Sequence, residues 1–348
     1  ALLTFILVTP APYILMIGVF IQILFGINLF YSVLISALIS IPYLYFGGFK
    51  SDIYTDIFEF FIMFLGLAII IPFALHLYGG FDYLINNLPP LHLTITGGNS
   101  VQYIIVWFFI ALWTMVDPTF HQRCYAAKDP KTAKNGILLS ILFWLIFDCL
   151  TTTIGLYSKA ILPNLSEPMW AYPLLAEKIL PPIAKGFFYA GLLATIMSTL
   201  NSYSLISSTT LGKDLFARFF NESDELKIKK YIQISILITT AFSILISLII
   251  PSVINIWYNI GTSIIPGLLL PVILGYFPKY KLSANNTFII MLVGWLSSSI
   301  SLIVGYIRYD NDMNNYLFGI EPMYLGLIIT ILLYLVFLFF ERKKYSSK

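Results

Sequence analysis

Long apolar runs, repeated along the whole chain, constrain the fold more than any other feature of this sequence. A helix needs about 20 mainly apolar residues to cross the hydrocarbon core of a bilayer, and the chain offers such stretches repeatedly, separated by charged or Gly/Pro-rich breaks. Of the 348 residues, 59% are hydrophobic and 11% are charged, whereas a soluble domain carries roughly 25% charge. We therefore predict an all-α integral membrane protein that crosses the bilayer many times.

The breaks between apolar runs predict about ten transmembrane helices. Their expected positions are residues 2–25, 29–46, 53–77, 102–121, 136–160, 184–210, 230–250, 252–276, 286–307 and 321–340. The segment 159–183 is rich in proline and is expected to form a small helical hairpin or cap between two of these spans.

The placement of basic residues predicts the orientation of the chain in the membrane. Cytoplasmic loops of membrane proteins carry an excess of Lys and Arg. If the N-terminal end of the first span is cytoplasmic, only Lys159, Lys178, Lys185 and Arg308 of the 20 basic residues lie outside. The expected protein is therefore a multi-pass protein of the plasma membrane, surrounded by lipid, with its C-terminus in the cytoplasm.

Several classes of function lack their usual residues in this sequence. The chain has two cysteines and three histidines, without the spacing of metal ligands, and we find no phosphate-binding loop, dinucleotide fingerprint or HExxH motif. His76, His92 and His121 are too scattered to form one reactive cluster. We predict no enzymatic activity, no cofactor and no nucleic-acid partner.

The stretch "WTMVDPTFHQR", residues 113–123, places a carboxylate and a helix breaker inside an apolar span. Asp117 lies about fifteen residues past Gln102, which is ~22 Å along a helix axis. Pro118 removes a backbone donor and interrupts the helix, and a carboxylate in hydrocarbon is costly. Asp117 is expected either to face a polar cavity, as interrupted helices do in secondary transporters, or to lie at a simple kink and pair with Arg123 or Lys128.

A cluster of hydroxyl groups follows in "ATIMSTLNSYSLISSTT", residues 194–210. Thr195, Ser198, Thr199 and Ser202 are spaced by three and four residues, so they share one face of a helix. Hydroxyl and carbonyl oxygens suit a small hard cation. Small hydroxyl residues also favour close packing of membrane helices, and the residues alone favour this second interpretation.

Acidic residues in "GGFKSDIYTDIFEFF", residues 47–61, mark the start of the next span. Asp52, Asp56 and Glu59 suit the N-terminal end of a helix electrostatically. Alternatively, Asp56 and Glu59 line a path by which a cation leaves toward the cytoplasm. Asp148, four residues after Trp144, is a further carboxylate inside a predicted span.

Four stretches resemble the sodium:solute symporter family, and they occur in the order found in that family. The segments are "GGFKSDIYTDIFEF", "DPTFHQRCYAAKD", "LPPIAKGFFYAGLLATIMSTLNSYSLISSTTLGKDLF" and "IWYNIGTSIIPGLLLPVILGYF". The third is the most specific match, through its A-x-IMST-x-x-S core and the later K-D-L-F. In the second, Asp117 stands where proline and pantothenate members have Gln.

The resemblance implies a five-plus-five inverted repeat of the leucine-transporter type. On that map, residues 1–348 form one transporter domain, in which 1–101 are the rest of the first repeat, 102–276 the second repeat and 277–348 additional C-terminal helices. The resemblance also implies that Trp113, Thr114, Asp117 and Pro118 form the substrate-binding segment. Ser198, Thr199 and the carbonyl of Thr195 would bind sodium, and Asp56 would assist its release.

The resemblance further implies sodium-coupled symport of a small organic solute by alternating access, with Na⁺ as the coupling ion. Sugar members carry Lys and Asn where this chain has Trp144 and Ile110, so an amino acid or organic acid is expected rather than a sugar. The family's first helices, which supply other sodium ligands, have no counterpart in this sequence, which is expected to be a fragment. The rival interpretations are a truncated protein that does not transport and a membrane sensor module.

Overall fold

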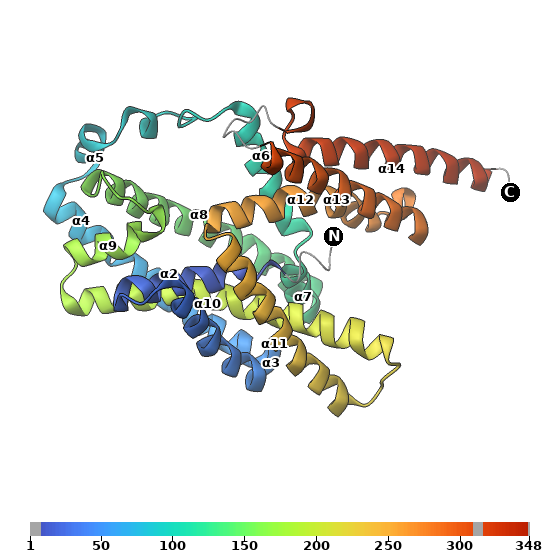
Figure 1. Cartoon of the computed structure of the whole chain (residues 1–348), viewed down its shortest axis with the longest axis horizontal. Helices are drawn as coiled ribbons and strands as arrows, with labels where there is room; N and C mark the ends of the chain where they lie inside the picture. Colours follow the sequence, from blue (N-terminus) through green and yellow to red (C-terminus); the bar gives the residue numbers. More distant parts are fainter. Residues whose placement is uncertain (1–7, 309–315, 347–348) are drawn as a thin grey trace. The chain divides into compact units, whose positions relative to one another are not determined.

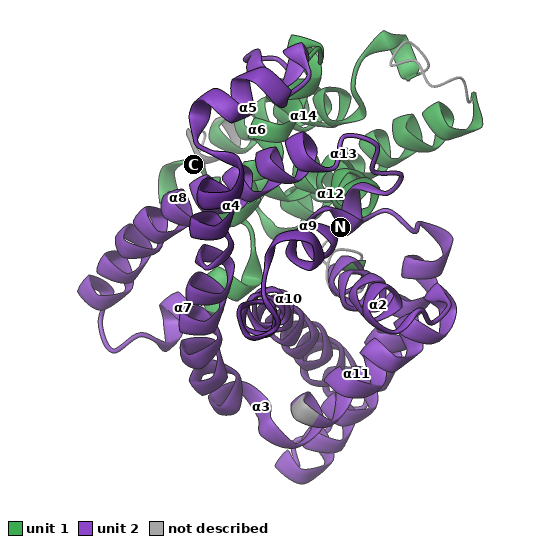
Figure 2. Cartoon of the chain, turned by 90° about the vertical axis from the view of Figure 1, so that its left-hand side faces the viewer, with its two compact units in different colours: residues 1–8, 98–122, 254–348 green, residues 9–97, 123–253 purple. Residues whose placement is uncertain are grey.

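The computed structural model describes residues 8–308 and 316–346, and within those ranges all regular structure is helical (Figure 1). The chain divides into two compact units (Figure 2). Unit 1 comprises residues 1–8, 98–122 and 254–348, and unit 2 comprises residues 9–97 and 123–253. Each unit is assembled from segments that are distant in sequence.

Unit 2 contains most of the long helices, and side-chain hydroxyls join several of them. Ser36 donates to the carbonyl of Ile14 at 3.0 Å, and Ser247 donates to the carbonyl of Ala11 at 2.8 Å. These two bonds attach α2 to α3 and α11. The helices of this unit are α2 (Ala11–Phe25), α3 (Leu29–Ala68), α4 (Ile70–Tyr78), α5 (Phe81–Asn87), α8 (Pro130–Ile161), α9 (Ala171–Ile179), α10 (Pro182–Thr209) and α11 (Glu225–Ile249), with short turns η1 (Pro90–Leu93), η3 (Pro168–Trp170) and the π-helical η4 (Thr210–Ala217).

The short helix α9 covers one end of unit 2. Its residues Leu175 and Ala176 are fully buried, and they belong to an apolar core that includes Ile154 of α8 and Phe188 of α10. Tyr157 of α8 also donates to the carbonyl of Gly79, at the end of α4, at 2.7 Å. The helical cap predicted within residues 159–183 is therefore present.

Unit 1 packs around α12, and hydroxyl groups of two other helices donate to its carbonyls. Thr330 donates to the carbonyl of Pro266 at 3.0 Å, and Ser298 donates to the carbonyl of Ser263 at 2.8 Å. These bonds join α12 to both α14 and α13. The elements of the unit are α6 (Val101–Ala111), η2 (Leu112–Met115), α12 (Val253–Gly275, beginning at the unit boundary), η5 (Pro278–Tyr280), α13 (Ala284–Ile307), η7 (Leu317–Gly319) and α14 (Pro322–Ser346); α7 (Pro118–Ala126) begins here and ends in unit 2.

Eight helices of the described residues are long and apolar enough to span a membrane, or nine if one bent pair counts as a span. The eight correspond to the third to tenth predicted spans. The first two, 2–25 and 29–46, form a pair bent by 118° at residues 26–28. The described residues thus account for eight or nine of the about ten predicted spans. The 15 residues of α2 extend about 22 Å at 1.5 Å per residue, less than the ~30 Å hydrocarbon core. The first residues of the first predicted span lie outside the described part of the chain.

The two glycines predicted to end a span instead mark a kink inside α3. Gly48 has φ 64° and ψ −170°, a combination that non-glycine residues rarely adopt. The helix continues beyond the kink, and the span assigned by apolarity is Leu44–Tyr78. The kink therefore divides α3 just before the residues that carry Asp52, Asp56 and Glu59.

Candidate functional site

The helix that contains Asp117 is interrupted, as its sequence predicts. Ser100 begins α6 by accepting a hydrogen bond from the Tyr103 amide at 3.2 Å. The helix ends at Ala111, tightens into the turn η2, and restarts as α7 at Pro118. The amides of Val116 and Asp117 both donate to the carbonyl of Trp113, at 2.8 and 2.9 Å. Because Pro118 has no amide hydrogen, the regular pattern cannot continue through the break.

The Asp117 carboxylate lies at this break and is fully buried. Its Oδ2 accepts a hydrogen bond from the Trp113 indole at 2.9 Å. Its Oδ1 accepts from both the amide and the hydroxyl of Thr119, at 2.8 and 2.7 Å. An aspartate that accepts from an amide two residues later is a common helix N-cap. Asp117 thus caps α7 and also holds the indole of the residue four positions earlier.

Further contacts within unit 1 fix the side chains around the break. The Trp113 ring lies edge-to-face on Trp257 of α12, with the ring centroids 5.4 Å apart. Thr114 donates its hydroxyl to the carbonyl of Ala111 at 3.2 Å. His121 Nε2 lies 3.0 Å from the carbonyl of Met115, so this nitrogen carries the hydrogen. The break is therefore an ordered structure with defined side-chain partners.

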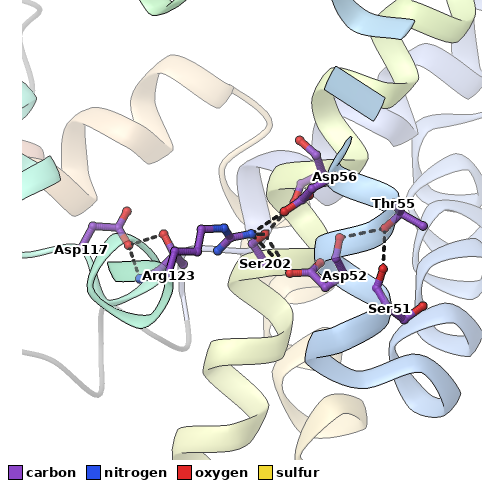
Figure 3. Close-up of polar contacts among 9 residues, drawn as sticks. Ser51, Asp52, Thr55, Asp56, Asp117, Arg123 and Ser202 are labelled. Atoms are coloured by element: carbon purple, nitrogen blue, oxygen red, sulfur yellow. Dashed lines mark hydrogen bonds and ion pairs between the residues drawn. The ribbon is translucent and has the colours of Figure 1, made fainter. Parts of the chain in front are cut away.

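A second polar cluster, which we call the Arg123 cluster, consists of Asp52, Asp56, Arg123 and Ser202 of unit 2 (Figure 3). The Arg123 guanidinium donates to Asp56 at 2.6 Å and to Asp52 at 3.4 Å. The same group donates to the Ser202 hydroxyl at 2.6 Å. Arg123, which the kink interpretation proposed as a partner of Asp117, thus bonds to Asp52, Asp56 and Ser202. It joins α7 to α3 and α10.

The Arg123 cluster holds more negative than positive charge. The Asp52 side chain is 1% exposed, and its Oδ1 has no hydrogen-bond partner among the described residues. Glu59, one helical turn beyond Asp56, also has a buried and unpartnered oxygen, Oε2. One guanidinium therefore contacts two carboxylates, Asp52 and Asp56, and a third carboxylate lies one turn further along α3. An arrangement of this kind can accept a cation or protons.

The predicted sodium ligands lie together on α10, in unit 2. The Thr195 hydroxyl donates to the carbonyl of Gly191 at 2.8 Å, and the Thr199 hydroxyl donates to the carbonyl of Thr195 at 3.4 Å. The carbonyl of Ser198 accepts from Ser202 at 2.9 Å. Each of these bonds runs to a carbonyl one turn earlier in the same helix, as is common for Ser and Thr in helices. The donor set consists only of hard hydroxyl and carbonyl oxygens, which fit a sodium ion.

Sequence reasoning found the break but missed most of the Arg123 cluster. Asp56 was expected on an ion path, whereas Asp52 was interpreted as a helix-end charge and Ser202 as one of several packing hydroxyls. The spacing Asp52–Asp56–Glu59 was the available signal, because residues four and seven apart share one helical face. The partner Arg123 lies 71 residues from Asp52 along the chain, and no local pattern predicts that contact.

Comparison with known proteins identifies the family. The model of the sodium:solute symporter family matches residues 1–294. The chain belongs to the sodium:solute symporter family. The family comprises membrane transporters rather than enzymes, and its membership confirms the resemblance drawn from the sequence motifs.

Individual relatives of this symporter-family chain include three bacterial transporters. The sodium/pantothenate symporter of Haemophilus influenzae is 30% identical over 244 residues, which cover 68% of this chain and 50% of that protein. The sodium/pantothenate symporter of Escherichia coli is 26% identical over 309 residues, covering 84% and 61%. A sodium/proline symporter of Staphylococcus aureus is 26% identical over 258 residues, covering 70% and 50%. The chain thus spans about half the length of such relatives.

A solved structure shares the fold. A Na⁺-coupled sialic acid symporter in a substrate-bound, outward-open state superposes with a TM-score of 0.70 at 18% identity. The match covers 95% of this chain and 72% of that structure. The predicted all-α membrane fold of the leucine-transporter type is therefore confirmed. The division of the symporter-family chain into repeats at residues 101 and 276 remains a prediction.

Proposed function

We propose that this protein carries out sodium-coupled uptake of a small organic solute by alternating access. One observation carries the proposal: a membrane helix of a symporter-family chain is broken around a fully buried carboxylate. Exposed backbone at membrane depth is tolerated where protein or a cavity covers it, and transporters use such breaks for binding. Sodium and solute would each favour the same conformation, so each raises the affinity for the other.

The solute side of the proposal assigns Trp113, Thr114, Asp117 and Pro118 to the binding segment. Trp113 offers an aromatic surface, and Thr114 offers a hydroxyl next to the break. The proposed solute is an amino acid or an organic acid rather than a sugar. The names of the relatives, which transport proline or pantothenate, support this class.

The sodium side of the proposal assigns the Ser198 and Thr199 hydroxyls and the Thr195 carbonyl as ligands. They share one face of α10 and supply only hard oxygens. Asp56 would lie on the path by which sodium leaves, where Arg123 holds it in the described conformation. The membrane potential contributes a driving force of about 2.3 kcal/mol per 100 mV for each sodium ion that moves inward.

The proposed orientation follows from the basic residues, which predict a cytoplasmic C-terminus in the plasma membrane. We also propose that residues 1–101 are the rest of the first repeat, that residues 102–276 form the second repeat and that residues 277–348 form additional C-terminal helices. With Cys124 and Cys149 replaced by Ser, a cysteine introduced after Lys343 should react with a membrane-impermeant reagent only in permeabilised cells. Reaction in intact cells would contradict the orientation.

The transport proposal is tested by uptake into liposomes that contain the purified protein. Radiolabelled proline, pantothenate and glucose are offered under an inward sodium gradient, and under an equal potassium gradient as the control. We expect uptake of proline or pantothenate that requires sodium, and no uptake of glucose. Uptake that is equal in both gradients, or absent from well-folded protein, would overturn the proposal.

A further inference from the structure

Both oxygens of the Asp117 carboxylate are occupied by donors of the protein itself. The Trp113 indole lies 2.9 Å from Oδ2, and the Thr119 amide and hydroxyl lie 2.8 and 2.7 Å from Oδ1. These distances are typical of hydrogen bonds to a charged acceptor, which are stronger than neutral ones. Three of the roughly four acceptor sites of this carboxylate are taken and its side chain is fully buried, so it offers little to a solute.

The charge of Asp117 is also stabilised where it lies. The carboxylate stands at the N-terminal end of α7, a nine-residue helix, where the helix dipole favours a negative charge. Three hydrogen bonds and the helix end replace the water that a buried carboxylate loses. A cationic group on the solute is therefore not needed to balance this charge.

The bond from Trp113 to Asp117 closes the gap that the helix break leaves. It joins the turn η2 to Asp117, the residue that caps α7 just before Pro118. The anchored indole then packs edge-to-face on Trp257, with an interplanar angle of 65°. The carboxylate therefore helps to orient Trp113 and, through its ring, the contact with Trp257.

We propose that Asp117 is a positioning residue, which sets the Trp113 indole and the start of α7 and does not itself bind the solute. The inference rests on the proposed function and refines it. The binding segment presents an aromatic ring and hydroxyls, with its carboxylate turned inward to the protein. The binding segment then offers no free carboxylate to a monocation, so we expect the solute to be a neutral, zwitterionic or anionic molecule.

The first test measures the indole directly and needs no solute. Protein labelled with ¹⁵N-tryptophan gives an indole signal for Trp113, which is assigned by its loss in Trp113→Phe. We expect slow hydrogen exchange for this signal, and Asp117→Asn should shift it and accelerate exchange by about tenfold or more. Asp224→Asn is the matched control, because Asp224 also caps a helix by accepting from an amide two residues later, at 2.9 Å, but in an exposed position. A Trp113 signal that is insensitive to Asp117→Asn would overturn the proposal.

The second test asks whether Asp117 acts through Trp113. In the liposome assay above, Asp117→Asn should raise the KM for proline or pantothenate by about fivefold in the wild-type background and by less than about twofold in Trp113→Phe. Choline, a monocation, should be taken up by neither protein. Equal effects in both backgrounds, or choline uptake that Asp117→Asn abolishes, would show that Asp117 meets the solute.

The two tests separate failure of this inference from failure of the proposed function. If the wild type transports nothing, the function is rejected while the indole signal still decides the role of Asp117. If Asp117→Asn does not fold, Thr119→Ala removes only one of the three donors. It should shift the Trp113 signal in the same direction by a smaller amount, and an unchanged signal would contradict the proposal.

Discussion

Buried carboxylates in this chain are held by hydrogen-bond donors of very different origin. Asp117 is satisfied by residues within four positions of itself. Asp52 depends on Arg123 and Ser202, which come from other helices. The hydrogen bonds of Asp117 form together with α7, whereas the ion pair of Asp52 with Arg123 forms only when α3, α7 and α10 pack together. The two acidic sites should therefore respond differently to mutation.

Removing the guanidinium of the Arg123 cluster should destabilise unit 2. Arg123→Ala leaves Asp52 buried without a donor of positive charge, and an unsatisfied buried acceptor costs about 1–3 kcal/mol. We expect a lower Tm in detergent, partly restored in the double variant Arg123→Ala, Asp52→Asn. Lys227→Ala breaks the exposed pair with Glu222 and should leave the Tm unchanged. Equal Tm values for Arg123→Ala and Lys227→Ala would refute the structural role of the cluster.

The ion pair between α9 and α10 should show a defined pH dependence. Hydrogen bonds from Lys185 and Tyr189, both at 2.6 Å, lower the pKa of Glu177 below its usual value. A carboxylate whose folded-state pKa is lowered contributes stability above its unfolded pKa and loses it as the pH falls through the folded value. Glu177→Gln should therefore cost less than about 1 kcal/mol at pH 7, and the difference from wild type should vanish in acid. Glu167→Gln, in the same segment, is the control, and a difference that grows toward acid would contradict this account.

At the scale of helices, the sequence predicts breaks and caps well, because their causes are local. Pro118 begins a new helix after the break, and the proline-rich segment 159–183 folds into a cap. The bend at residues 26–28 falls between the first two predicted spans, 2–25 and 29–46, where Gly26 ends α2 with φ 67°. Apolar composition does not show whether this bent pair forms one span or two. The kink at Gly48 was interpreted as the end of a span, because glycine is common both at helix ends and at kinks.

The close approach of α3 and α10 is an element-scale feature with a direct test. A Cβ atom on Gly191 would lie 2.9 Å from the Gly66 Cα, so the backbones meet where neither residue has a side chain. We expect Gly191→Ala to lower stability by about 1–3 kcal/mol, as overpacking does elsewhere. Gly186→Ala lies on the same helix with no atom within 4 Å of its Cβ, and it should be neutral or slightly stabilising. Because Ala favours a helix more than Gly does, destabilisation by both substitutions alike would contradict this account.

At the scale of the whole molecule, the fold was predictable and the site only in part. Apolar periodicity and four motifs led to the correct fold and family. The contacts of Asp52, Arg123 and Ser202 depend on how distant helices pack, which no motif records. Two of the proposed sodium ligands on α10 already bond to each other, because the Thr199 hydroxyl donates to the Thr195 carbonyl. Sodium must therefore compete with this bond, and its affinity reports on the proposed site directly.

Sodium-dependent thermal stability of the purified protein, with and without the α10 hydroxyls, tests the central claim most directly. A ligand present at ten times its Kd stabilises by about 1.4 kcal/mol. We expect NaCl to raise the Tm relative to KCl at equal ionic strength, and the double variant Ser198→Ala, Thr199→Ala to abolish that difference. Thr153→Ala is the control, because its hydroxyl makes the same bond to its own helix on α8. A sodium response that survives loss of Ser198 and Thr199, or a wild type that responds equally to potassium, would contradict the account.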